Sequence, residues 1–167
     1  MNTLRITAAV AALALSATPA LAAPVVPDKQ ATATARIVKP LSLTWVQDLD
    51  FGTVTLVDAG PTTVTVALDG SRTCPGTAVT CSGASTAAKY KITGTNNQTV
   101  TVNSSNVSMT GPAGSTPLLL TVNAPASVAL GNSGSTGTEF AIGGSISVAG
   151  SQAEGTYIGT FAVTVNY

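Results

Sequence analysis

The segment TYIGTFAVTVNY, residues 156–167, decides the fold. Its large side chains recur at every second position, which places them on one face of an extended strand. That face carries Tyr157, Gly159, Phe161, Val163, Val165 and Tyr167. So regular an alternation predicts a β-strand and favours a central position in the core. A strand that ends the sequence is also suited to pairing with another protein by strand addition, with the Tyr167 carboxylate as its anchor. We therefore take Tyr157, Phe161, Val163, Val165 and Tyr167 as a candidate partner or self-association strand.

The same period of two recurs upstream. Alternating runs occupy residues 41–46, 53–57, 62–68, 88–94, 98–103, 117–123 and 140–149. Clusters of Gly, Pro, Asn and Ser separate them, and no segment has a helical period. Parallel crossovers need a helix or a comparably long connection, and none is available. The sequence predicts an all-β fold, an antiparallel β-sandwich of about nine strands, as a single domain over residues 31–167.

A further alternating run, residues 31–38, precedes those above and differs from them in its small side chains. Residues 23–30, APVVPDKQ, contain two prolines and no periodicity, so we expect a flexible leader. The run ATATARIV that follows places Ala31, Ala33, Ala35 and Ile37 on one face, and Pro40 separates it from the rest. We expect residues 31–38 to form a strand. Because its apolar face is small, we take those four residues as a candidate exchangeable strand that fits an open sheet edge.

Residues 1–22 have the layout of a secretory signal peptide. Arg5 precedes a largely apolar run from Ile6 to Leu15, and the small-x-small site Ala20-Leu21-Ala22 follows. The apolar run is too short to span a bilayer, which favours cleavage before Ala23 over retention as a membrane anchor. No later stretch is long and apolar enough to be a transmembrane anchor in the mature chain. We expect an exported bacterial protein of the periplasm, cell surface or extracellular space.

The only two cysteines, Cys74 and Cys81, lie in the exported part of the chain. Six residues separate them in a segment that contains Pro75 and Gly76. In an oxidising compartment such a pair predicts a disulfide that closes a short loop, with two free thiols as the alternative.

Composition argues against most enzymes and against nucleic-acid binding. The chain has 167 residues, no histidine, 8% charged residues and a formal net charge of zero. Histidine is the commonest proton shuttle and metal ligand, and phosphate binding requires basic clusters. Asp48 and Asp50 alternate in one extended segment, but turn residues whose carboxylates bind backbone amides are a simpler interpretation than a calcium site. We expect no enzyme activity, no catalytic residues, no cofactor, no metal site and no nucleic-acid partner.

Three segments carry a family resemblance: PLSLTWVQDLDFGTV (40–54), AAKYKITG (87–94) and FAIGGSISVAGSQAEGTYIGTFAVTVNY (140–167). Together they resemble DUF4402, a family of bacterial exported proteins. More distantly, the LDFG turn and the closing strand are similar to those of spore-coat-U-type and archaic chaperone–usher pilins. That resemblance implies an Ig-like or pilin-like sandwich completed by a strand from a neighbour. Those pilins usually have a cysteine before the LDFG element, where this chain has Trp45.

These observations favour a non-enzymatic structural protein, a cell-surface or pilus- or coat-like subunit that associates by β-strand pairing. Its partners would be further copies of itself, a periplasmic chaperone or an outer-membrane assembly protein. A monomeric secreted or periplasmic binding or adhesion module is the alternative, and a small outer-membrane β-barrel is a weaker one.

Overall fold

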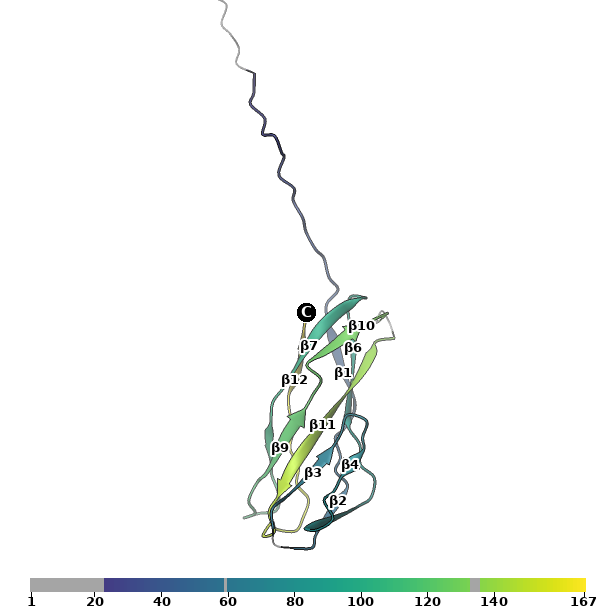
Figure 1. Cartoon of the computed structure of the whole chain (residues 1–167), viewed down its shortest axis with the longest axis vertical. Helices are drawn as coiled ribbons and strands as arrows, with labels where there is room; N and C mark the ends of the chain where they lie inside the picture. Colours follow the sequence, from purple (N-terminus) through teal and green to yellow (C-terminus); the bar gives the residue numbers. More distant parts are fainter. Residues whose placement is uncertain (1–22, 59, 133–135) are drawn as a thin grey trace, which may run out of the picture. The chain divides into compact units, whose positions relative to one another are not determined.

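A computed structural model describes residues 23–58, 60–132 and 136–167. The expected signal peptide, residues 1–22, lies outside the described residues. The chain divides into two units, residues 1–36 and residues 37–167. Residues 23–36 contain no strand and are exposed throughout (Figure 1). All strands described below belong to the second unit.

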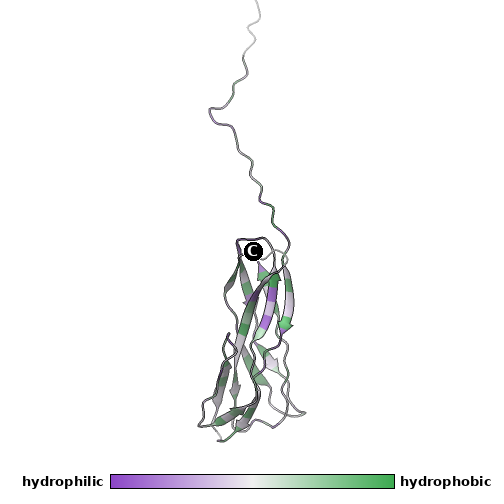
Figure 2. Ribbon diagram, turned by 90° about the vertical axis from the view of Figure 1, so that its right-hand side faces the viewer, coloured by the Kyte–Doolittle hydropathy of each residue, from purple (hydrophilic) through white to green (hydrophobic). Residues whose placement is uncertain are grey.

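The second unit is an all-β, antiparallel sandwich, as the alternating runs predict. Its described strands are β1 (Ser42–Gln47), β2 (Thr53–Leu56), β3 (Thr62–Val66), β4 (Arg72–Thr73), β5 (Val79–Ser82), β6 (Ala88–Thr93), β7 (Gln98–Ser104), β8 (Val107–Met109), β9 (Leu118–Asn123), β10 (Ser127–Leu130), β11 (Thr138–Val148) and β12 (Val163–Asn166). In Figure 2, hydrophobic and hydrophilic colours alternate along the strands. Such alternation is expected when one face of a sheet is buried and the other is solvated.

The largest sheet is organised around β11, its longest strand. One end of β11 pairs with β6, and β6 pairs in turn with β1. The other end of β11 pairs with both β3 and β9. Figure 1 shows β11 as a long strand of this sheet, and buried side chains occur along its whole length.

Two smaller sheets complete the sandwich. In one, β7 lies between β10 and β12, which makes β12 an edge strand. In the other, β2 pairs with β5 alone. Similarly, β1 is the terminal strand of the large sheet and pairs with β6 alone. Within the described residues, the first two strands and the last strand each have one edge without a partner strand.

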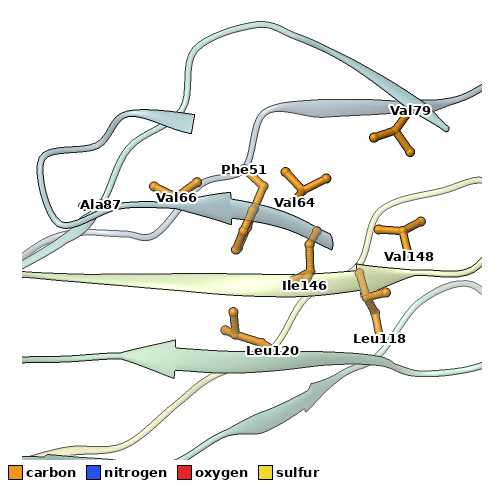
Figure 3. Close-up of a cluster of buried hydrophobic side chains, with 9 residues drawn as sticks. All are labelled: Phe51, Val64, Val66, Val79, Ala87, Leu118, Leu120, Ile146 and Val148. Carbon is orange, nitrogen blue, oxygen red and sulfur yellow. The ribbon is translucent and has the colours of Figure 1, made fainter. Parts of the chain in front are cut away.

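Two clusters of buried apolar side chains form the core. One lies among β6, β7, β10 and β11 and includes Ile92, Leu130 and Ile142, which have no exposed surface. The other consists of Phe51, Val64, Val66, Val79, Ala87, Leu118, Leu120, Ile146 and Val148. Figure 3 shows these nine side chains gathered together; they come from β3, β5, β9 and β11 and from the segments that contain Phe51 and Ala87.

The disulfide between Cys74 and Cys81 is present, with 6.1 Å between the two Cα atoms. Cys81 lies in β5 opposite Val54 of β2, so the bridge closes the loop that leads into this small sheet. Both cysteines are half-buried and pack against the second core cluster. The bridge therefore stabilises the loop beside β2.

The expected strand over residues 31–38 is not formed, and the prediction is wrong for the isolated chain. Ala31, Ala33, Ala35 and Ile37 lie in an extended stretch outside every strand, and Ile37 is 93% exposed. The alternation is suitable for a strand, but a strand also needs a hydrogen-bonded neighbour. The first residue in a strand is Ser42, beyond Pro40.

The prediction of a central position for the closing strand is also wrong. β12 is an edge strand, and the inward-facing Phe161, Val163 and Val165 are only half-buried. The alternation identifies the face that points into the core, but it does not reveal whether a neighbouring strand covers both edges. Residues 157–162 are extended but belong to no strand apart from one bridge between Ile158 and Thr110.

Candidate functional site

A groove lies between the beginning and the end of the sandwich. It is about 800 Å³ in volume. Every residue from Leu49 to Leu56 lines one wall, and residues 152–157 line the other. Its floor contains Leu118, Ile146 and Val148, which belong to the buried cluster drawn in Figure 3.

A smaller hollow of about 110 Å³ lies beside the first. Asp48 and Leu49 line one side, and residues 159–161 line the other. Leu49 lines both hollows, so they lie next to each other. We call the two hollows together, with walls 48–56 and 152–161, the terminal groove.

The first wall is held in place by the DLDFG turn. The carboxylate of Asp50 accepts a hydrogen bond from the Gly52 amide at 2.8 Å. Gly52 has a φ of 66°, in the left-handed region that favours glycine, and a Cβ there would lie 2.7 Å from the Ala84 carbonyl oxygen. The turn is therefore specific to glycine at this position, and Asp50 is the turn residue that the sequence predicts.

Arg72 attaches this turn to the cysteine hairpin. Its guanidinium donates hydrogen bonds to the carbonyl oxygens of Phe51 at 2.6 Å, Ser82 at 3.0 Å and Gly83 at 3.2 Å. The planar, five-donor guanidinium can reach several acceptors at once, which a lysine ammonium cannot do with the same geometry. The wall that contains β2 is consequently linked to β4 and β5.

The second wall is positioned by Tyr157. Its hydroxyl donates to the Ala153 carbonyl oxygen at 2.9 Å and accepts from the Gln152 amide nitrogen at 2.7 Å. The ring packs over Gly111, where a Cβ would overlap it. These contacts fold residues 152–157 into a compact loop beside β8.

Backbone hydrogen bonds of the second wall point away from the groove. The amide and carbonyl of Ile158 both bond to Thr110, at 2.9 and 2.8 Å. In an extended chain the backbone groups of successive residues point to opposite sides, so those of Tyr157 and Gly159 face the groove. Neither Gly159 nor Phe161 makes a backbone hydrogen bond to another described residue. The wall offers an edge to which a strand can bond.

The charged residues that line the groove are all acidic. Asp50 and Glu154 lie in the large hollow, and Asp48 lies in the small one. The sequence predicts that the Asp48 carboxylate binds a turn amide. In the structure it accepts a hydrogen bond from the Trp45 indole instead, at 2.9 Å. Burial raises the pKa of Tyr90 on the floor of the small hollow, and the Asp48 carboxylate raises the same pKa further.

The candidate partner strand and the terminal groove overlap. Tyr157 lines the large hollow and Phe161 the small one. Val163 and Val165 follow in β12, half-buried against the first core cluster. Tyr167 lies beyond β12, and its hydroxyl donates to the carbonyl oxygen of Lys39 at 2.6 Å. The groove itself, and the pairing of its walls from opposite ends of the sequence, were not predicted, because alternation alone does not show which strands are neighbours.

The described residues contain no group of three or more His, Cys, Asp or Glu side chains that could hold a metal ion. In the same part of the chain, no helix has the length and hydropathy needed to cross a bilayer.

Comparison with known proteins identifies one family. No curated protein matches the sequence, and no solved structure matches either. The family model described as "Domain of unknown function (DUF4402)" matches residues 41–167. The match begins one residue before β1 and includes both walls of the terminal groove. The chain belongs to the DUF4402 family.

Proposed function

We propose that this protein is an exported structural subunit of the cell surface, a pilus- or coat-like protein that associates through β-strand pairing. Its partner would be a second copy, a periplasmic chaperone or an outer-membrane assembly protein. One observation carries the proposal: the core-facing side chains of β2 and of the last strand, β12, are only half-covered, while a strand-like segment of the same chain, residues 31–38, lies outside every strand.

The contrast between central and terminal strands supports this proposal. Val64 and Val66 of the central β3 are fully buried, whereas Val54 and Leu56 of β2 remain half-exposed although they pack against the same cluster. Apolar surface exposed along an unpaired sheet edge promotes association with another strand. The sandwich has the surface expected of a fold that is completed on assembly.

Export is supported by the disulfide and by the signal-like residues 1–22. Disulfides persist in oxidising compartments and are rare where thiols are kept reduced. The bond between Cys74 and Cys81 therefore fits a periplasmic, cell-surface or extracellular protein.

The proposal is tested by mixing two preparations of the full-length protein that carry different tags. After the two are unfolded and refolded together, we expect them to co-purify and to remain together in denaturant that dissociates ordinary surface contacts. Full-length protein that stays monomeric under all refolding conditions, and also with periplasmic extract, would contradict the proposal. A monomeric binding module with a ligand in the terminal groove would then be the better account.

A matched pair of variants tests whether residues 31–38 provide the pairing strand. Ala33→Asp places a charge on the apolar face, and Thr34→Asp places the same charge on the opposite face. Both positions are exposed in the isolated chain, so neither variant should affect folding. We expect Ala33→Asp to abolish co-purification and Thr34→Asp to preserve it. Equal behaviour of the two variants would show that this segment does not pair through its alanine face.

A further inference from the structure

We infer that the terminal groove is the docking site for residues 31–38 of a second copy of this chain. The inference rests on the proposed function and identifies both the acceptor surface and the segment that it receives.

The first argument is the hydrogen-bonding capacity of the two walls. β2 pairs with β5 along one edge only, and its other edge borders the groove. On the opposite wall, Ile158 bonds to Thr110 on the far side, so the backbone groups of Tyr157 face the large hollow that β2 borders, and those of Gly159 face the small hollow beside it. A strand placed between these walls would have backbone partners on both edges, as an interior strand of a sheet does.

The second argument is the match in length and side-chain size. The wall from Leu49 to Leu56 has as many positions as the segment from Ala31 to Val38. The groove floor is already occupied by bulky buried side chains, among them Leu118 and Ile146. A strand that presents alanines to this floor can approach closely, and Ile37 would bury a side chain that is otherwise 93% exposed.

The third argument is charge. The groove is lined by Asp48, Asp50 and Glu154, without a lysine or arginine among its lining residues. Residues 31–38 contain Arg36 and no acidic residue. Complementary charges of this kind favour the correct pairing and accelerate association.

Crosslinking between two copies tests the inference directly. One preparation carries Thr34→Cys in the incoming segment, and the other carries Thr55→Cys on the rim of the groove. Both threonines are exposed, and a short bismaleimide joins the new thiols while Cys74 and Cys81 remain paired. A third preparation with Thr99→Cys, an exposed position on β7 outside the groove lining, is the control.

We expect a crosslinked heterodimer of Thr34→Cys with Thr55→Cys. Docking raises the effective concentration of the thiols to about the millimolar range, so the yield should exceed that with Thr99→Cys by about tenfold or more. Thr160→Cys, on the opposite wall, should also react above the control. Adding Ala33→Asp to the incoming chain should lower the crosslinking yield to that of the Thr99→Cys control.

Three outcomes would overturn the inference, and they are distinguishable. If the copies co-purify and depend on Ala33 but crosslink equally at Thr55 and Thr99, the groove assignment is wrong and the proposed function survives. If they neither co-purify nor crosslink, the proposed function fails as well. A single chain that carries both Thr34→Cys and Thr55→Cys gives the third outcome. If this chain crosslinks within itself at all dilutions and the two separate preparations do not crosslink, residues 31–38 occupy the groove of their own chain and not that of a second copy.

Discussion

The hydroxyl of Tyr167 donates a hydrogen bond to the Lys39 carbonyl oxygen at 2.6 Å and joins the end of the sandwich to its beginning. The same hydroxyl accepts a hydrogen bond from the Thr95 amide at 2.8 Å. One side chain thus holds together the chain segments that precede β1 and follow β6.

Replacing Tyr167 with phenylalanine removes both hydrogen bonds and keeps the ring. The two interactions are partly exposed, so we expect the free energy of unfolding to fall by about 1–2 kcal/mol. Urea denaturation measures the change. Tyr90→Phe is the control, since the Tyr90 hydroxyl makes no hydrogen bond to a described residue. A loss of the same size in both variants would mean that ring environment, not the Tyr167 hydroxyl, is responsible.

Phe161→Asp should destabilise the fold much more than Thr160→Asp. Phe161 packs against both core clusters, whereas Thr160 is exposed. Loss of a half-buried ring and introduction of a charge should lower the free energy of unfolding by about 2–4 kcal/mol. The same charge at Thr160 should leave the free energy of unfolding nearly unchanged. Thermal unfolding of the two variants gives the comparison. Equal destabilisation would show that both faces of this segment are covered.

Replacing both Cys74 and Cys81 with serine should leave a folded protein. The chain-entropy model assigns about 2–3 kcal/mol to so short a loop, less than the stability of a typical domain. We expect a lower unfolding midpoint and an unchanged far-ultraviolet circular dichroism spectrum. A variant that is unfolded in buffer would show that the disulfide is needed to form the β2–β5 sheet.

Arg36→Glu should slow association of the copies, because it brings a negative charge to an acidic groove. Lys29→Glu makes the same change in charge upstream of residues 31–38 and should have a smaller effect. Association rates measured by light scattering over a range of salt concentrations should differ less at high salt, where charges are screened. Equal rates for Arg36→Glu and the unsubstituted protein at low salt would show that charge does not guide docking.

Exported protein should begin at Ala23. The predicted cleavage follows Ala20-Leu21-Ala22, so N-terminal sequencing or intact mass of protein from the periplasm or medium is the test. Material that retains Arg5 would support the membrane-anchor alternative.

The alternation of apolar side chains predicts the strands well, but it does not predict their neighbours. Phe161, Val163 and Val165 do face the core, yet an edge strand and a central strand share this pattern, and the burial of these residues depends on strands from elsewhere. Residues 31–38 show the same limit, because their alternation is present without any partner strand. β4 and β8, with two and three residues, are too short for a period of two to stand out from their turns.

β5 was missed for a different reason. The two cysteines indicate a disulfide loop, although Val79 and Cys81 also alternate with Thr80 and Ser82. That alternation is a signal that could have identified the strand. The terminal groove, in contrast, had no signal in the sequence, since its walls come from residues about a hundred positions apart and meet only after the sheets have formed.

The three hydrogen bonds of Arg72 bear on how an incoming strand would bind. They hold the Phe51 carbonyl and the β5 hairpin in one arrangement before any partner arrives. A receptor wall that is already rigid loses little conformational entropy on docking, so the ordering cost falls almost entirely on the extended segment that enters. Affinity should then respond more to stiffening of residues 31–38 than to any further stabilisation of the groove.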